Sequence, residues 1–294
     1  MSQTSDRIRK MFGEQDTIRD AGLTTPEDVT RYDDIVYGAD PRWQVLDVYR
    51  PKAAEGQKLP VIVSVHGGGW VYGDKERYQF YCMSLAQRGF AVVNFTYRLA
   101  PESKFPASLE DTNSVFTWVL ENAGAYGFDA KHIFAVGDSA GAHNLGLYAG
   151  ICTNPAYAAE YDFRPPQGFV PTAIALNCGA YRVTIDPEKQ DLTQLLMADY
   201  LPEQGSPKEL ALISVADHVT AHYPPTFFMT SNGDFLKDQA PILAAKLAQV
   251  GVPFIYRFYG DEKTELPHVF HCNMRLPEAA LCNDEECAFF REFL

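Results

Sequence analysis

A serine between two glycines is the residue of this chain best placed to act as a nucleophile. Gly137-Asp138-Ser139-Ala140-Gly141 separates the apolar run HIFAVG from a segment rich in small residues. In a G-x-S-x-G pattern a strand turns sharply into a helix, and the turn exposes the serine hydroxyl above the sheet. The first N–H groups of that helix can also bind a developing anion. The spacing predicts that Ser139 attacks an acyl carbon; the alternative is a serine that only caps the helix.

Three consecutive glycines follow another apolar run, in SVHGGGW at residues 64–70. Glycine is costly to order, so this run indicates a backbone that passes close to another group. When a serine attacks an ester, negative charge grows on the carbonyl oxygen, and each N–H group aimed at it lowers the barrier by roughly 3 kcal/mol. We therefore predict an oxyanion hole formed by the N–H groups of Gly67, Gly68 and Ala140. A plain glycine turn would not explain why the loop accompanies a serine elbow.

A serine hydroxyl needs an adjacent base to take up its proton. Five of the seven histidines stand in positions that do not suit this role: His66, His132, His143, His218 and His222. His143, for example, follows the serine by four residues and would lie on the flank of its helix. The other two, His268 and His271, stand in the loop after the last apolar run. That loop is therefore predicted to supply the base.

An acid must then orient the imidazole and stabilise its charged form. Asp234 follows directly after the apolar run at 226–231, and Asp238 stands four residues later. Asp238 has a structural role already, because it can cap a helix predicted over residues 239–250. This leaves Asp234 as the better candidate for the acid.

The elements that must position these residues alternate between strand and helix. Six short, apolar, β-rich runs predict strands: 60–66, 90–97, 132–137, 172–178, 226–231 and 253–259. Helical segments lie between most of them: 77–88, 107–122, 140–152 and 239–250. Such alternation is typical of a parallel α/β sheet, and DIVYG and WQVLDVYRP, joined by ADPR, predict an antiparallel hairpin before it. We expect one domain over residues 1–294, in which residues 1–30 and 183–223 form a cap or lid.

The composition is that of a globular protein with an excess of acidic residues. Of the 294 residues 46% are hydrophobic and 21% charged, and the net charge of −13 disfavours nucleic acid and anionic lipid as partners. No stretch reaches the roughly 18 apolar residues of a membrane span, and the N-terminus lacks a secretory signal, so we expect a cytoplasmic protein. Six scattered cysteines predict free thiols. A monomer and a homo-oligomer are both compatible with the sequence.

Three motifs, in their order along the chain, resemble a known family. HGGGW, YRLAPESKFPASLED at residues 97–111, and GDSAG are similar to the hormone-sensitive-lipase-type branch of the α/β-hydrolases, which includes many bacterial carboxylesterases. The resemblance extends over most of the chain from about residue 34. It implies the α/β-hydrolase fold, with a mostly parallel, eight-stranded sheet flanked by helices. The hairpin and the six later strands would supply that number.

The resemblance also selects between the candidate bases and acids. The HVF turn at His268 is similar to the family's HGF turn, with Val269 in place of glycine, so His268 is predicted to be the base and His271 is the runner-up. The run DFLKD at 234–238 matches the family pattern D-P-L-x-D, which selects Asp234. The chain order Ser139, Asp234, His268 is the order expected in α/β-hydrolases.

Together, these residues and the resemblance predict a serine carboxylic-ester hydrolase. Ser139 would attack a small, short-acyl ester of the acetyl type, His268 would move the proton, and Asp234 would orient the imidazole. Water would then release the acyl group, without a cofactor or a metal, and the expected partner is a small-molecule ester. Four aromatic residues adjoin the motifs and are predicted to line the substrate pocket, with ordinary packing as the alternative for each: Trp70, Tyr72, Tyr181 and Phe235.

Three alternatives stay open at this point. An amidase of the kynurenine-formamidase type shares the fold and a similar glycine loop. A non-catalytic binding protein is the second alternative, since the plant gibberellin receptors resemble this family but lack the catalytic histidine. The third alternative is a zinc site, for which the C-terminal region offers five ligand-type residues: His268, His271, Cys272, Cys282 and Cys287.

Overall fold

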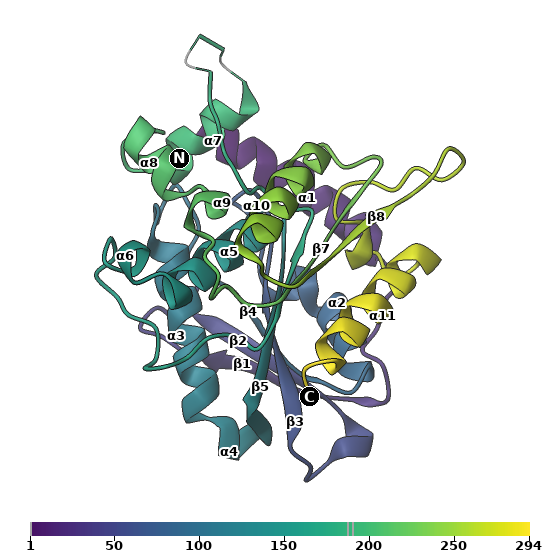
Figure 1. Cartoon of the computed structure of the whole chain (residues 1–294). Helices are drawn as coiled ribbons and strands as arrows, with labels where there is room; N and C mark the ends of the chain where they lie inside the picture. Colours follow the sequence, from purple (N-terminus) through teal and green to yellow (C-terminus); the bar gives the residue numbers. More distant parts are fainter. Residues whose placement is uncertain (1, 187, 190) are drawn as a thin grey trace.

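A single eight-stranded sheet crosses the molecule in the order β1-β2-β4-β3-β5-β6-β7-β8 (Figure 1). The computed structural model describes residues 2–186, 188–189 and 191–294. The strands are β1 (Val29–Val36), β2 (Val45–Pro51), β3 (Leu59–Val65), β4 (Ala91–Phe95), β5 (Phe128–Asp138), β6 (Ile174–Asn177), β7 (Thr226–Ser231) and β8 (Phe254–Tyr259). β2 pairs antiparallel with β1 and β4, and the other neighbours pair parallel. The predicted hairpin and mostly parallel sheet are therefore confirmed.

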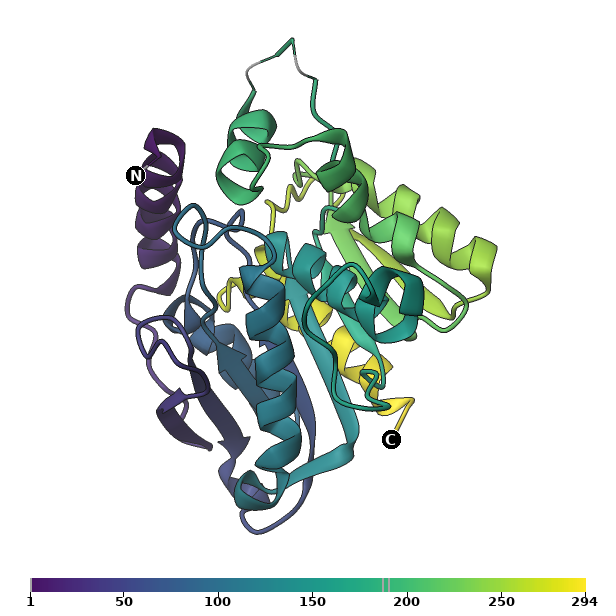
Figure 2. The same ribbon diagram turned by 90° about the vertical axis from the view of Figure 1, so that its left-hand side faces the viewer.

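Helices cover both faces of this sheet (Figure 2). They are α1 (Gln3–Asp20), α2 (Lys75–Gln87), α3 (Ala107–Glu121), α4 (Ala123–Tyr126), α5 (Ala140–Thr153), α6 (Pro155–Ala158), α7 (Leu192–Tyr200), α8 (Pro207–Leu212), α9 (Val215–His218), α10 (Ala240–Val250) and α11 (Pro277–Arg291), with the 3-10 turns η1 (Lys52–Ala54), η2 (Lys237–Gln239) and η3 (Phe270–Cys272). None of the described helices is both long and apolar enough to cross a membrane.

The central strands are apolar on both faces because each face has its own core. In β3, Val61 and Val63 pack into the cluster shared with α3, α5 and α10. Ile62, which points the opposite way, packs into the cluster shared with α2 and α11. A strand buried on both faces needs apolar side chains at every position, which explains the continuous apolar runs of the sequence.

Helix α10 differs from the prediction at its start and agrees with it at its end. Its C-cap is Gly251, whose φ of 76° lies in the left-handed region that glycine favours. Asp238 does not cap the helix: it lies within η2, and Gln239 occupies the N-cap position without a side-chain hydrogen bond. The cap prediction was wrong because the chain enters α10 through a 3-10 turn, which places Asp238 before the cap.

The two predicted cap segments lie at the same end of the sheet, as both views show. α1 comes from the first segment, and α7, α8 and α9 come from the second. The hydroxyl of Ser5 donates to Asp199 over 2.5 Å and joins α1 to α7. Positions 1, 187 and 190 of these segments lie outside the described residues. Movement of the segments as a lid stays a prediction.

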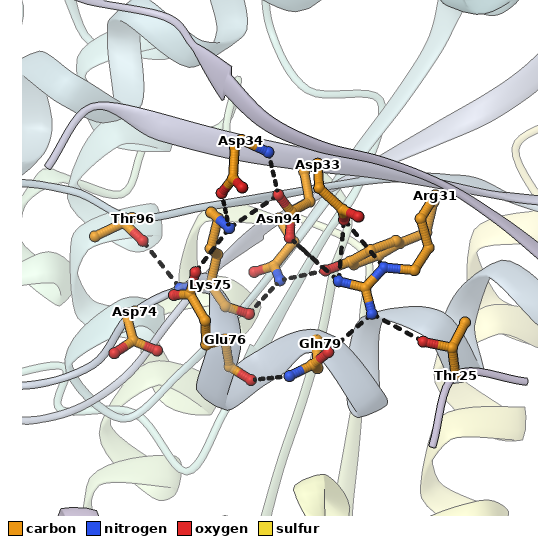
Figure 3. A network of polar contacts seen from close by, with 12 residues as sticks. Thr25, Arg31, Asp33, Asp34, Asp74, Lys75, Glu76, Gln79, Asn94 and Thr96 are labelled. Atoms are coloured by element: carbon orange, nitrogen blue, oxygen red, sulfur yellow. Dashed lines mark hydrogen bonds and ion pairs between the residues drawn. The ribbon is translucent and has the colours of Figure 1, made fainter. Parts of the chain in front are cut away.

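A buried lysine ties the N-terminal hairpin to the start of α2 (Figure 3). The ammonium group of Lys75 contacts carboxylate oxygens of Asp34 (2.8 Å), Asp47 (3.0 Å) and Glu76 (2.7 Å). A register shift between β1 and β2 accompanies this contact, and Asp34, with a φ of 58°, stands within the shift.

Two hydrogen bonds hold the backbone of Lys75. Its N–H donates to the hydroxyl of Thr96 (2.9 Å), and its carbonyl accepts from the amide of Asn94 (2.7 Å), as Figure 3 shows. Because α2 begins only six residues after Gly69, these bonds fix the point at which the glycine loop leaves the site.

Replacing Lys75 with methionine should lower the free energy of unfolding by about 3 kcal/mol, because a buried carboxylate loses its nearest cation. That carboxylate belongs to Asp47, which is only 1% exposed. Urea denaturation at pH 7 measures the effect. Lys58→Met, which changes an exposed lysine, is the control and should stay within about 0.5 kcal/mol of the wild type. An unchanged urea midpoint for Lys75→Met would contradict this account.

Candidate active site

Ser139 is the single residue between a strand and a helix. β5 ends at Asp138, α5 begins at Ala140, and Ser139 has a φ of 51° and a ψ of −119°. A positive φ is uncommon for a residue with a Cβ, and such strain clusters at functional sites. The turn needs Gly141, since a Cβ there would lie 2.0 Å from the carbonyl oxygen of Val65. The predicted elbow is therefore present.

His268 bridges the serine and a buried carboxylate. Its Nε2 lies 2.9 Å from the Oγ of Ser139, and its Nδ1 lies 2.6 Å from Oδ1 of Asp234. Burial alone would raise the pKa of Asp234, but the hydrogen bond and the charge of His268 outweigh it and hold the pKa below its ordinary value. Since an ionised carboxylate only accepts, Nδ1 donates to Asp234 and Nε2 is left to accept from the serine hydroxyl.

Asp234 has two further donors that fix its orientation. The hydroxyl of Thr230 donates to Oδ2 over 2.6 Å, and the N–H of Leu236 donates to Oδ1 over 2.8 Å. The structure thus brings together the three residues predicted to react. It does not bring His271 or Asp238 to the serine: His271 is buried against Cys272, and Asp238 lies on η2.

The contacts of Gly67 contradict its predicted role as an oxyanion donor. The N–H of Gly67 donates to the hydroxyl of Tyr78 over 2.9 Å, and that hydroxyl donates to Oδ2 of Asp138 over 2.7 Å. Gly67 therefore cannot donate to an oxyanion, because its only N–H is already bound. Burial raises the pKa of Asp138 to about 6, against the opposing hydrogen bond from Tyr78.

The next two glycines are the better donors. Gly68 and Gly69 have φ values of 117° and 60°, and within the described residues no acceptor binds their N–H groups. Both line the same cavity as Ser139 and Ala140. A Cβ on Gly68 would lie 2.1 Å from the carbonyl oxygen of Tyr72, so no other residue fits there. Gly69 therefore joins Gly68 and Ala140 as a candidate oxyanion donor in place of Gly67.

The sequence indicates Asp138 only as a part of the serine motif, and it does not indicate Tyr78. Tyr78 stands in a helix that buries two tyrosines, Tyr78 and Tyr81, so its type and spacing held no signal. His66 contacts the backbone of the glycine loop and not the serine: its Nδ1 lies 2.7 Å from the carbonyl oxygen of Gly67.

A cavity of about 720 Å³ opens in front of Ser139. Three predicted aromatic residues line it: Trp70, Tyr72 and Phe235. Tyr181 does not, which corrects the prediction: it is 1% exposed, and its hydroxyl donates to the carbonyl of Leu176 over 2.8 Å. Tyr181 follows β6 closely enough to fold back into the core, which its position beside the motifs did not reveal.

Hydrogen bonds hold two of the lining aromatic residues, Trp70 and Tyr72. The indole N–H of Trp70 donates to Nδ1 of His143 over 3.1 Å, and the indole stacks on Tyr200. The hydroxyl of Tyr72 donates to Asp16 of α1 over 2.8 Å. His143 therefore packs behind the cavity rather than beside the serine, as its position on the helix predicted.

The zinc alternative is not supported by the positions of its ligands. Among the described residues, ligand-type atoms converge in two groups, Asp138 with His271 and Cys272, and Cys178 with Asp234 and His268. His268 and His271 thus fall into different groups. Cys282 and Cys287 belong to neither group: both are residues of α11 whose side chains are buried in the core. All six cysteines are free thiols.

Known proteins share both the sequence pattern and the fold of this chain. The BD-FAE family model matches residues 46–247. The chain belongs to the BD-FAE family. Esterase B from Lactobacillus rhamnosis, in complex with an inhibitor, superposes with a TM-score of 0.88 and 26% identity over 99% of this chain and 96% of that one.

Two relatives are named as esterases. Versiconal hemiacetal acetate esterase of Dothistroma septosporum is 27% identical over 80% of this chain and 73% of its own length. Esterase LipQ of Mycobacterium tuberculosis is 28% identical over 81% of this chain, which spans only 56% of LipQ. The resemblance to hormone-sensitive-lipase-type carboxylesterases with an α/β-hydrolase fold is thereby confirmed.

A buried glutamate stands behind Ser139 in this BD-FAE member. Glu286 of α11 accepts from the hydroxyl of Tyr81 (2.9 Å) and from the amide of Asn177 (2.6 Å). The carbonyl of Asn177 in turn accepts the N–H of Ser139 over 2.9 Å. Burial raises the pKa of Glu286 to about 7, against these two hydrogen bonds.

Removing the hydroxyl of Tyr78 should lower kcat for ester hydrolysis about tenfold, since the oxyanion loop loses the bond that holds Gly67. Tyr78→Phe keeps the ring and deletes the hydroxyl, which accepts from Gly67 and donates to Asp138. Steady-state kinetics of the variant measure the effect. Tyr259→Phe, which removes a hydroxyl bound to Glu285 instead, should keep the wild-type kcat. A wild-type kcat in Tyr78→Phe would show that this bond does not position the loop.

Replacing Glu286 with glutamine should weaken the dependence of stability on pH. The pKa of Glu286 is raised to about 7 in the folded protein. Its protonated carboxyl therefore stabilises the fold fully below the pKa of the unfolded chain, and this stabilisation is lost as the pH rises through 7. Glutamine carries no charge at either pH. When the side-chain amide of Asn177 flips, its Oδ1, which has no partner in the wild type, can accept a hydrogen bond from the glutamine amide.

The stability of Glu286→Gln relative to the wild type should therefore be greater at pH 8 than at pH 5, by about 2 kcal/mol. Urea denaturation at both pH values tests this. Glu292→Gln changes an exposed carboxylate near the end of α11 and serves as the control. Parallel pH profiles of Glu286→Gln and the wild type would refute a buried, titrating glutamate.

Proposed function

We propose that this carboxylesterase hydrolyses small, short-acyl esters of the acetyl type through a Ser-His-Asp triad and an acyl-enzyme. Ser139 is the nucleophile, His268 the base and then the acid, and Asp234 the residue that orients the imidazole. The observation that carries the proposal is the pair of contacts of His268, 2.9 Å to Ser139 and 2.6 Å to Asp234. Both distances are those of hydrogen bonds, as proton transfer requires.

In the first step His268 takes the proton of Ser139 as its Oγ attacks the ester carbon. The charge that develops on the carbonyl oxygen faces the N–H groups of Gly68, Gly69 and Ala140. Nε2 then gives its proton to the oxygen of the departing alcohol. A water molecule, activated by the same imidazole, attacks the acyl-enzyme and regenerates the serine.

Several observations support a short acyl group. Trp70 follows directly after the oxyanion glycines and is only 7% exposed, and its contacts with His143 and Tyr200 leave it little freedom to move. Leu196 and Met197 of α7 line the same cavity, and Leu196 lies against Gly69. Large side chains thus crowd the part of the cavity that lies next to the oxyanion loop. The name of the Dothistroma relative, an acetate esterase, agrees with this choice.

Asp234→Asn should lower kcat for ethyl acetate by a factor on the order of 10⁴, because asparagine favours the wrong imidazole tautomer. Hydrolysis is followed by titration of the released acid. Asp238→Asn is the matched control four residues away, and it should retain wild-type turnover. If Asp238→Asn lost activity and Asp234→Asn kept it, the assignment of the acid would be wrong.

An active-serine phosphonate should label the wild type, whereas Ser139→Ala should stay unlabelled. The same preparation, assayed with N-formylkynurenine and with ethyl acetate, separates the amidase alternative from the esterase. Faster hydrolysis of the formamide would favour the amidase. A wild type that takes up no phosphonate would favour a non-catalytic binding protein.

A further inference from the structure

A buried cysteine lies beside the proposed acid and base, although the mechanism above does not use it. The sulfur of Cys178, a carboxylate oxygen of Asp234 and an imidazole nitrogen of His268 all lie within 4.8 Å of one another. Cys178 is 1% exposed and lies behind the residues that line the cavity. Its side chain is therefore placed to act on Asp234 and His268 rather than on a bound substrate.

The order of the strands brings Cys178 to this place. It follows directly after β6, which lies between β5, the strand of the elbow, and β7, the strand that leads to Asp234. The carbonyl of Asn177, which ends β6, accepts the N–H of Ser139. The N–H of Cys178 donates to the carbonyl of Met229 on β7 over 2.8 Å. The backbone at this point thus joins the strand of the acid to the elbow of the nucleophile.

The backbone of Cys178 has a conformation that is uncommon for a residue with a side chain. Its φ of 48° lies in the left-handed region, which glycine would adopt without strain. The side chain belongs to the buried apolar cluster shared with α2 and α11, so packing is one account of it. Packing explains a small apolar side chain here, but it does not explain a polar sulfur within reach of a buried carboxylate.

The thiol of Cys178 keeps a proton that it can donate. Burial, and then the charge of Asp234, raise the pKa of Cys178 well above its ordinary value, against an opposing hydrogen bond from the backbone of Val269. A side-chain hydrogen bond with Asp234 acts in the same direction as burial. The sulfur also lies 3.8 Å from Sδ of Met229, but a thioether is a weak acceptor and an ionised carboxylate is a strong one. The S–H group therefore favours Asp234.

We propose that Cys178 is a positioning residue for ester hydrolysis: its thiol donates a weak hydrogen bond to Asp234 and contacts the turn that carries His268, so that acid and base keep their relative orientation. Asp234 then has a donor from the end of β6 besides the hydroxyl of Thr230 and the N–H of Leu236. The inference rests on the proposed hydrolase function and adds a residue that acts through the acid of the triad.

The test measures kcat and KM for ethyl acetate against pH in Cys178→Ala and Cys178→Ser. Cys178→Ala should lower kcat about fivefold, because acid and base lose a weak bond that orients them. The midpoint of the acid limb of kcat/KM should rise by about 0.5 pH unit, because a carboxylate with fewer donors favours the charged imidazole. KM should not change, since Cys178 lies behind the cavity lining. Cys178→Ser keeps a donor and should retain the wild-type kcat and midpoint.

Cys287→Ala is the matched control. It removes the same atoms from the same buried cluster, but on α11, and it should keep the wild-type kcat and pH profile. In an Asp234→Asn background, Cys178→Ala should have no further effect on kcat, because a residue that acts through Asp234 has lost the group on which it acts. If urea denaturation shows that Cys178→Ala does not fold, Cys178→Gly takes its place, because glycine suits the left-handed φ.

The outcomes separate this inference from the proposed function. An unchanged kcat and acid limb in Cys178→Ala would overturn the inference and leave the hydrolase proposal intact. An equal loss of kcat in Cys178→Ser or in Cys287→Ala would show that packing is the role of the side chain, and it would overturn the inference as well. A wild type that does not hydrolyse ethyl acetate would overturn both proposals.

Discussion

The hydrogen bond between Nε2 of His268 and Oγ of Ser139 requires three loops to meet with the accuracy of a few tenths of an ångström. Its two atoms come from loops 129 residues apart, and the carboxylate that orients the imidazole comes from a third loop. The parallel order β5-β6-β7-β8 brings these loops together, because the C-terminal ends of adjacent parallel strands share one edge of a sheet. The sheet therefore provides the distances that proton transfer needs.

Behind that edge, buried polar groups hold the backbone that carries the site. Tyr78 joins the oxyanion loop to Asp138, and Glu286 holds Asn177, whose carbonyl binds the N–H of the nucleophile. Lys75 ties the exit of the loop to the hairpin. An unpaired polar group costs far more in the interior than at the surface, so each bond favours one loop geometry over its alternatives.

Costly backbone conformations gather at the same place. Trp70, Ser139 and Val269 all have positive φ and all line the cavity. Such conformations persist only where the surrounding structure over-determines them. Here the strands below and the helices on both faces supply that support.

The sequence by itself was sufficient for the sheet, the elbow and the three proposed catalytic residues. Strands buried on both faces leave continuous apolar runs, and a serine elbow needs glycines at fixed spacing, so both are visible as local patterns. The choice of His268 and Asp234 over their neighbours came from a resemblance to known motifs, and the structure places both residues beside Ser139.

Three predicted details were wrong because each depended on the path of the backbone, which local composition does not reveal. Gly67 loses its N–H to Tyr78, a residue of a helix that begins after the loop, and Tyr181 turns into the core instead of the cavity. Asp238 falls in a 3-10 turn before its helix. Local composition determined which residues could bend, react or lie buried. Only the tertiary structure decided which donor each buried polar group meets, because those partners are distant in the chain and adjacent only in space.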